Sequence, residues 1–164
     1  MSTTQQYDDI MQLVTFVLGK ETFGVDVLKV QEIIRIVDVT RVPNSPSFVE
    51  GVINLRGKIL PVIDLRKRFG LSYAERDKDS RIVVIEFADK VVGFLVDRMR
   101  EVVRVERNSV DAPPNLVTSS TSRYITGVVQ LEDRLLTLLD LDRVLTTAEQ
   151  EQLASQGEPE AIAA

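Results

Sequence analysis

The sequence contains no cysteine and no histidine, and these absences exclude much of the chemistry open to a protein of 164 residues. Without cysteine the chain can form neither a disulfide nor a thiolate metal site. Without histidine it lacks the commonest general base and metal ligand. Neither common glycine-rich phosphate motif is present. These absences argue against an enzyme, and we expect neither a metal nor another cofactor.

Long hydrophobic runs and an excess of positive charge are also missing. No apolar run could cross a bilayer, and the polar stretch 1–9 does not resemble a signal peptide, so we expect a cytoplasmic protein without membrane insertion. The net charge is −5, and the four glutamates after Thr146, where no lysine or arginine occurs, account for four of these charges. A nucleic-acid surface needs a cationic excess, so we expect no nucleic-acid partner.

The most informative feature that is present is an internal repeat. The segment 51–65 reappears without a gap as 127–141, and the upstream segment 24–36 aligns with 93–105. Two blocks that recur in the same order indicate a duplicated fold unit. We assign the residue types shared by both copies to the scaffold, and we treat positions where the copies differ as candidates for function.

Short strands and tight turns dominate the pattern. The expected strands are 13–18, 23–27, 49–55, 58–63, 82–87, 90–96, 125–131 and 134–139. Short helices are expected at 64–69 and 140–145, and loops at 41–46 and 106–123. For 28–34 the spacing fits a short helix, whereas the equivalent part of the second copy fits a strand, so both remain open.

We therefore expect a mainly β protein that consists of two small antiparallel barrels, whose closure would remove exposed edges. The first repeat covers about 11–70 and the second about 81–146, joined by a charged linker at 71–80, and strands can be exchanged between the barrels. A repeat of this size has a thin core, so the two should pack together. We expect flexible ends: residues 1–10 form a tail, and 147–164 form an acidic, partly disordered tail.

Asp64 and Asp140 occupy equivalent positions, each between a strand and a short helix. A pair of carboxylates can serve catalysis or bind a metal. An aspartate before a helix can instead accept hydrogen bonds from the free backbone N–H groups of the first turn. Because the aspartate recurs in both copies, we interpret it as a helix cap.

Arg66, Lys67 and Arg68 form a basic trio that the second copy lacks. The fold therefore does not demand these charges. We interpret the trio as a solvated helix face rather than as a phosphate site.

The turn between the repeated strands differs in charge between the copies: Asn54–Gly57 in the first, Gln130–Asp133 in the second. Upstream, Glu32 has Glu101 as its counterpart. An ion pair between Glu32 and Arg56 is possible in the first copy, whereas Glu101 and Glu132 would repel each other if the second copy brought them together. Because the two copies share a scaffold but differ in their polar residues, we expect a single recognition face. Alternatively, Arg56 is an ordinary turn residue.

At these residues the sequence resembles the CheW-type chemotaxis coupling proteins. The blocks LKVQEI, VINLRG and LPVIDL carry the resemblance in this order, at 28–33, 52–57 and 60–65. The segments 91–97 and 124–127 extend it, so that it covers about residues 11–146.

The resemblance implies two SH3-like five-stranded β-barrels with a hydrophobic interface, and no catalysis. It implies an adaptor between the cytoplasmic hairpin tip of chemoreceptors and the regulatory domain of a CheA-type histidine kinase, recruited to membrane-associated arrays in which other copies join in rings. The implied receptor-binding residues are Val30, Glu32, Asn54, Arg56 and Ile59. The implied kinase-binding residues are Asp111, Asn115 and Leu116.

Overall fold

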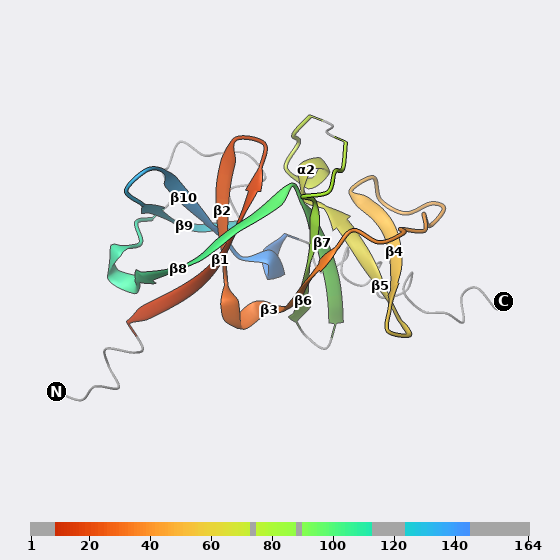
Figure 1. The fold of residues 1–164 in the computed structure, drawn as a ribbon, viewed down its shortest axis with the longest axis horizontal. Coiled ribbons are helices and arrows are strands. Elements are labelled where there is room, and N and C mark those ends of the chain that lie inside the picture. The colour runs from red at the N-terminus through yellow and green to blue at the C-terminus, as the bar shows by residue number, and fades with distance from the viewer. Residues whose placement is uncertain (1–8, 73–74, 88–89, 113–123, 145–164) are drawn as a thin grey trace.

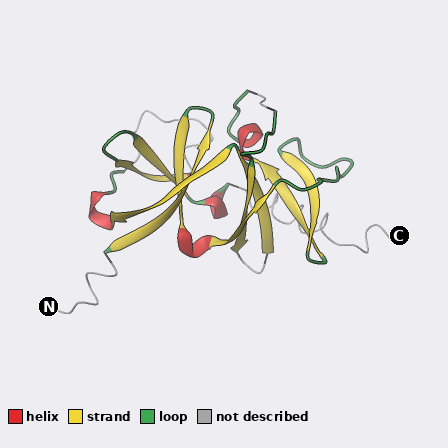
Figure 2. Ribbon diagram, viewed as in Figure 1, coloured by secondary structure: helices red, strands yellow, loops and turns green. Residues whose placement is uncertain are grey.

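The fold consists of ten β-strands and four short helices over the described residues of the computed structural model, 9–72, 75–87, 90–112 and 124–144 (Figure 1). The strands are β1 (Ile10–Leu18), β2 (Glu21–Asp26), β3 (Val30–Arg35), β4 (Val49–Leu55), β5 (Lys58–Asp64), β6 (Arg81–Phe87), β7 (Lys90–Val96), β8 (Arg98–Glu106), β9 (Ile125–Gln130) and β10 (Leu135–Leu139). The helices are η1 (Val27–Lys29), α2 (Leu65–Arg68), η2 (Arg107–Ser109) and η4 (Leu141–Arg143), and each lies at the end of a strand (Figure 2).

The strands form two five-stranded sheets, sheet A in the order β8-β1-β2-β10-β9 and sheet B in the order β3-β6-β7-β5-β4. This confirms the mainly β fold of two SH3-like five-stranded units. The expectation of closed, antiparallel barrels is wrong in two respects. The two edge strands of each sheet do not pair, so both sheets are open, and β2–β10 and β5–β7 are parallel pairs. We call the gap between the two edge strands of a sheet its seam.

The sheets do not follow the boundary between the repeats. The first repeat contributes β1 and β2 to sheet A and β3, β4 and β5 to sheet B. The second contributes β6 and β7 to sheet B and β8, β9 and β10 to sheet A. Each sheet thus combines the first hairpin of one repeat with the last three strands of the other, so the red and blue segments lie side by side in Figure 1.

The core is divided into one large shared cluster and two small ones. The shared cluster takes Phe16 and Phe23 from sheet A and Ile85 and Phe94 from sheet B, so it lies between the sheets. Smaller clusters lie within sheet B, around Ile53, and within sheet A. Most of the large buried side chains therefore join the two sheets, which explains why neither repeat needs a thick core of its own.

The segment 28–34, left open between helix and strand, contains both. Asp26 accepts a hydrogen bond from the Leu28 backbone N–H at 3.0 Å and thereby caps η1, and β3 begins directly afterwards at Val30. One turn of 3-10 helix thus turns the chain out of sheet A and into sheet B. The short helices expected at 64–69 and 140–145 are α2 and η4.

Candidate functional site

The first candidate surface lies where the β4–β5 turn meets the edge strand β3. Arg56 and Gly57 form this turn, and both have positive φ angles, 53° and 86°. This is the backbone of the tightest hairpin turns, in which glycine is favoured. The Asn54 side-chain carbonyl accepts a hydrogen bond from the Gly57 N–H at 2.9 Å. Asn54 therefore shapes the turn that presents Arg56.

Arg56 and Glu32 form a bidentate ion pair across the seam of sheet B. Arg56 Nη1 donates to Glu32 Oε1 at 3.1 Å, and Nη2 donates to Oε2. The hydrogen bond and charge of Arg56 hold the pKa of Glu32 below its usual value, and Glu32 in turn raises the pKa of Arg56. The Arg56 side chain is 68% exposed, so solvent screens the pair and its effect on stability is small. The pair expected from the sequence is confirmed, and it fixes the direction of an exposed guanidinium.

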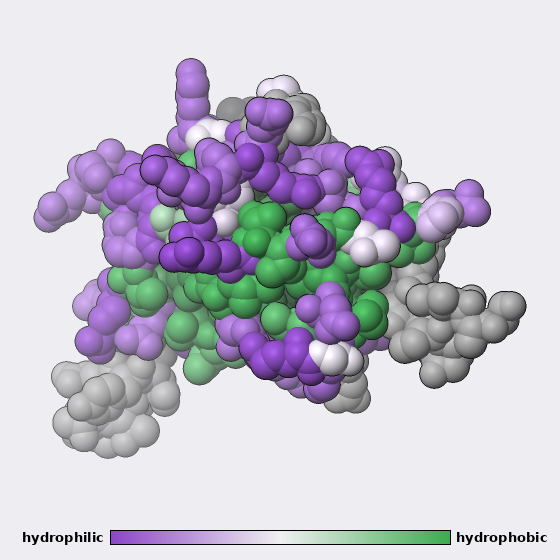
Figure 3. Space-filling model, turned by 45° about the vertical axis from the view of Figure 1, so that its right-hand side comes forward, coloured by the Kyte–Doolittle hydropathy of each residue, from purple (hydrophilic) through white to green (hydrophobic). Residues whose placement is uncertain are grey.

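Apolar side chains stand near this ion pair. Ile59 lies opposite Asn54 in the β4–β5 register and is exposed, whereas Val30 is half-buried against the shared core. Figure 3 shows apolar surface open to solvent between polar rims. The large exposed apolar residues of the described chain are Leu28, Ile33, Val37, Ile59, Leu71, Val102 and Leu135.

The sequence analysis missed Ile33. Ile33 and Arg35 share one face of β3 and are exposed, as is Gln31 at the register shift between Val30 and Glu32. An isoleucine between two polar residues on a solvent-facing row is the signal that could have identified it. The structure thus brings together Glu32, Asn54, Arg56 and Ile59, while Val30 lies at the inner end of the same strand as Glu32.

The second repeat has its own ion pair at the equivalent place. Arg134 Nη2 donates to Glu101 Oε1, and Arg134 Nη1 lies 3.0 Å from the Asp133 carboxylate. The pKa of Glu101 is lowered, first by a backbone hydrogen bond and then by Arg134. The sequence analysis did not identify this partner of Glu101: an arginine two positions beyond the equivalent of Arg56 supplies the cation.

On the proposed kinase side, the structure describes Asp111 alone. Asp111 and Val128 exchange two backbone hydrogen bonds, each of 2.9 Å, so this residue extends the edge of sheet A beside β9. Asn115 and Leu116 lie outside the described residues.

Both repeated aspartates cap a short helix, as the sequence predicts. Asp64 accepts a hydrogen bond from the Arg66 backbone N–H at 2.9 Å, and Asp140 accepts one from the Asp142 N–H at 3.1 Å. Burial raises the pKa of Asp64 in spite of the hydrogen bonds that it accepts. In the described part of the chain, no group of three or more acidic side chains is placed to hold a metal ion.

The interpretation of the basic trio as a solvated face is wrong, because all three side chains are engaged. Arg66 forms two hydrogen bonds with the Asp97 carboxylate, at 2.8 and 2.6 Å. Lys67 pairs with Glu50 at 3.1 Å. Arg68 donates to the Val144 carbonyl at 2.9 Å and lies over the rings of two aromatic side chains, Phe48 and Tyr124. The trio fastens α2 to both sheets.

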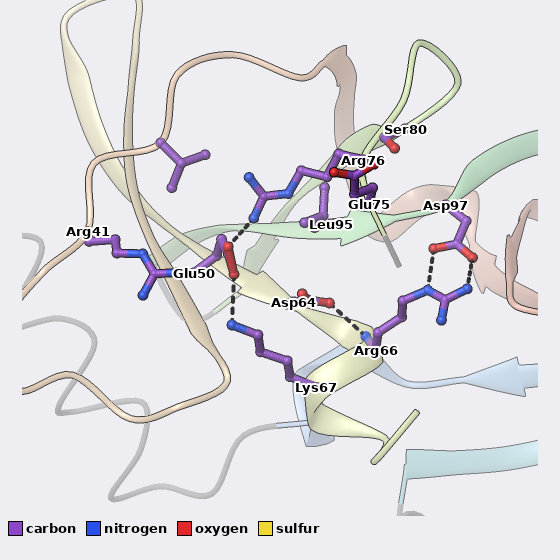
Figure 4. A pocket seen from close by; sticks show the side chains of 11 residues that line it. Arg41, Glu50, Asp64, Arg66, Lys67, Glu75, Arg76, Ser80, Leu95 and Asp97 are labelled. Atoms are coloured by element: carbon purple, nitrogen blue, oxygen red, sulfur yellow. Dashed lines mark hydrogen bonds and ion pairs between the residues drawn. The ribbon is translucent and has the colours of Figure 1, made fainter. Parts of the chain in front are cut away.

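A polar pocket of about 460 Å³ lies beside α2 (Figure 4). At its centre Glu50, whose side chain is only 10% exposed, pairs with both Lys67 and Arg76. Burial acts to raise the pKa of Glu50, but the hydrogen bond from Lys67 and the two positive charges outweigh it, so this pKa is lowered. Arg76 belongs to the charged linker, and Arg66 donates to the Ser72 carbonyl of the same segment. The pocket's charges therefore hold the linker against α2, which is a structural role.

No helix among the described residues has the length and apolar character needed to span a membrane.

The comparisons with known proteins agree on one family. The model of the CheW-like domain matches residues 12–149. The chemotaxis protein CheW of Treponema pallidum is 36% identical over 152 residues, which cover 90% of this chain and 89% of that protein. That of Klebsiella aerogenes is 37% identical over 138 residues, covering 84% and 83%. Among solved structures, the scaffolding protein TtCheW from Thermoanaerobacter tengcongensis superimposes with a TM-score of 0.74 at 38% identity, covering 79% of this chain and 88% of that one.

Proposed function

Because the chain belongs to the CheW-like family of chemotaxis scaffold proteins, we propose that it is a non-enzymatic adaptor that couples chemoreceptors to a histidine kinase. One surface binds the cytoplasmic hairpin tip of a chemoreceptor, and another binds the regulatory domain of a CheA-type kinase. The adaptor then acts in the cytoplasm at membrane-associated receptor arrays, where other copies join it in rings. This proposal carries the family's role over to the residues described above.

The observation that carries the proposal is the oriented Arg56 guanidinium beside exposed apolar side chains. A helix can lay apolar side chains into a groove for binding area, while a charged group at the rim sets its register. Glu32 holds Arg56 in one direction, so less side-chain freedom is lost on binding. Ile59 on β5 and Ile33 on β3 supply exposed apolar side chains. These features support a receptor-binding role for Val30, Glu32, Asn54, Arg56 and Ile59.

The kinase-binding role rests on the resemblance alone. Asp111 lies on the edge of sheet A, a different sheet from the Glu32–Arg56 pair. Two partners could therefore bind at once without competing for one surface. Asp111, Asn115 and Leu116 remain the residues proposed for this contact.

The deciding experiment titrates a receptor hairpin fragment and a kinase regulatory domain against the full chain and three variants. Arg56→Glu should weaken receptor binding by about tenfold or more, because it leaves Glu32 unpaired and reverses the rim charge. Kinase-domain affinity should stay within about threefold, since that contact lies elsewhere. Receptor control of kinase activity in a reconstituted array should be lost.

Two matched variants accompany Arg56→Glu. Glu132→Arg alters the equivalent position of the second repeat, and Lys78→Glu makes the same change in charge on the linker, where Lys78 is exposed. Both should bind the receptor fragment as the parent does. Equal receptor affinity for Arg56→Glu and the parent would remove Arg56 from the site, and failure of the parent to bind either partner would refute the adaptor role.

A further inference from the structure

Two arginines lie directly opposite each other in sheet B. Arg35 of the edge strand β3 pairs with Arg81 of β6 in the antiparallel register. Residues opposed in this way share one face of the sheet, with their Cβ atoms about 4.5–5.5 Å apart. Like charges placed directly opposite each other destabilise a sheet. The pair therefore needs an explanation other than the stability of the fold.

No acidic side chain of the described structure neutralises this pair. Arg81 Nη1 donates to the backbone carbonyls of Lys78, at 2.7 Å, and Ser80, at 2.8 Å, and neither arginine forms an ion pair with a described residue. Arg35 is exposed and Arg81 is half-buried. The two carbonyls use only part of the Arg81 guanidinium, since an arginine carries five N–H donors. The remaining donors of the pair are therefore available to a ligand from outside.

The other sheet shows that the fold does not require two arginines at this place. The segments 24–36 and 93–105 are repeat equivalents, which aligns Arg35 with Arg104. Arg104 of β8 pairs with Gln12 of β1, and β1 holds the same place in sheet A as β6 holds in sheet B. Gln12 is thus the equivalent of Arg81. Because sheet A has a neutral side chain opposite its arginine, the second arginine is an addition peculiar to sheet B.

An exposed apolar side chain stands beside the arginine pair. Ile33 precedes Arg35 by two residues on β3 and lies opposite Val83, so the two residue pairs share a face of the sheet. Ile33 is 41% exposed, whereas Val83 belongs to the shared core. Arg35 also lies three residues along β3 from Glu32, the partner of Arg56. The arginine pair therefore borders the surface that we assign to the receptor.

We propose that Arg35 and Arg81 bind a carboxylate of the chemoreceptor hairpin and so favour receptors that carry an acidic residue at this point. The inference rests on the proposed receptor-binding role and deepens it. Ile33 and Arg35 are roughly 6–7 Å apart along the strand, at about 3.3 Å per residue. Side chains three or four positions apart on a helix have a similar spacing, about 5–6 Å. The recognised helix would therefore carry an apolar and an acidic residue three or four positions apart on one face.

The surroundings of the pair favour a protein carboxylate over the phosphates of a nucleic acid or a membrane. Guanidinium groups bind carboxylate and phosphate with similar geometry, so the arginines alone do not distinguish these ligands. A polyanion is bound through an extended cationic field, which the net charge of −5 opposes. The exposed Ile33 instead matches an amphipathic helix, which lays apolar side chains on its partner. A single carboxylate between two guanidinium groups would also relieve their repulsion.

The test titrates a chemoreceptor hairpin fragment against the full chain and its variant Arg35→Glu. This change places a carboxylate opposite Arg81 in the sheet, so it should not lower the melting temperature in thermal unfolding. It should nevertheless weaken receptor binding by about tenfold or more, because the pair loses its net charge and the new carboxylate repels that of the receptor. A residue that served the fold alone would not lose binding while stability is kept.

Arg104→Glu is the matched control, because it makes the same change in charge at the equivalent site of sheet A. It should bind the receptor fragment within about twofold of the parent. In the fragment, each acidic residue is changed to lysine in turn. One of these changes should weaken binding to the parent and restore binding to Arg35→Glu, as a direct charge pair requires.

The outcomes separate this inference from the adaptor role itself. Equal receptor affinity for Arg35→Glu and the parent, with weakened binding by Arg56→Glu, would overturn the inference alone. The absence of any fragment variant that restores binding to Arg35→Glu would overturn it as well. If the parent does not bind the receptor fragment, the receptor-binding role and the inference both fall. Anionic vesicles or a single-stranded oligonucleotide that bind the parent more tightly than the fragment does, and lose affinity for Arg35→Glu, would assign the pair to a polyanion and overturn the proposal.

Discussion

Arg134 reaches Glu101 across the seam of sheet A from a position two residues beyond the repeat equivalent of Arg56. Arg56 spans the seam of sheet B in the same manner, by binding Glu32. In each case the glutamate comes from one edge strand, β8 or β3, and the arginine from the turn that follows the other, β9 or β4. In each sheet, a side-chain ion pair thus links the two edge strands where backbone pairing is missing. Both repeats contain this link, but the arginine sits two positions later in the second.

If the Glu101–Arg134 ion pair stabilises the fold, stability should depend on the two charges being opposite rather than on which residue carries which charge. Arg134→Glu should lower the melting temperature, because it places a third carboxylate beside Glu101 and Asp133. The double exchange Glu101→Arg/Arg134→Glu should recover a large part of the loss. Thermal unfolding followed by circular dichroism measures both. If the double variant melts no higher than Arg134→Glu, the pair does not hold the seam.

Strands and turns were largely predictable from the sequence because they depend on local alternation and on turn residues. The Asn54–Gly57 turn and the caps at Asp64 and Asp140 are set by residues within three positions of one another. Even the Glu32–Arg56 pair could be found, since the repeat alignment set Glu32 and Arg56 against Glu101 and Glu132 and so exposed the difference in charge.

The predictions that were wrong concern contacts between residues far apart in the chain. Arg66 and Asp97 are 31 positions apart, and Arg68 reaches Val144 across 76 positions. Nothing in the local pattern distinguishes these arginines from solvated ones. The seam that stays open and the parallel pairs β2–β10 and β5–β7 also follow from the exchange of hairpins between repeats, which no local signal reports.

The two capping aspartates allow a matched comparison. Asp64→Ala and Asp140→Ala should each lower the free energy of unfolding by about 1 kcal/mol, since the capped N–H group loses its acceptor. Chemical denaturation measures this cost, and partner affinity of the folded protein should barely change. Asp64→Asn should keep much of the cap and lose less. A selective loss of binding without destabilisation would contradict the structural role.

Gly51 should tolerate no side chain, because backbone atoms occupy the space that a Cβ would need. At its repeat equivalent, Gly127, the nearest atom belongs to a side chain instead. The φ of Gly51 is +151°, and a Cβ there would lie 2.3 Å from the Thr40 carbonyl oxygen, a backbone atom. At Gly127 the nearest atom, 2.4 Å away, belongs to the Val110 side chain, which can rotate. Gly51→Ala should therefore destabilise by about 1–3 kcal/mol or more, and by more than Gly127→Ala. Equal costs in urea unfolding would show that the Thr40 segment moves aside.

Two carboxyl groups of the polar pocket, those of Glu50 and Asp64, should change the stability of the fold with pH in opposite directions. Glu50 has a folded-state pKa below its usual 4.5, so its ionisation stabilises the fold above that pH. This stability is lost as the pH falls through the folded pKa. Glu50→Gln should therefore be roughly 1–3 kcal/mol less stable at neutral pH, because Lys67 and Arg76 lose their charged partner. Its free energy of unfolding should also fall less steeply than the parent's below about pH 5.

Asp64 provides a control, because its pKa is shifted in the opposite direction from that of Glu50. Burial raises its folded-state pKa above the usual 3.8, so its contribution is fully present below that pH and is lost as the pH rises through the folded pKa. Asp64→Asn removes this loss, and the stability of that variant should rise more steeply with pH than the parent's between about 4 and 6. Urea unfolding at several pH values measures both slopes. If the two variants shift the slope in the same direction, the Lys67 and Arg76 contacts do not keep Glu50 ionised, and the linker is held by other means.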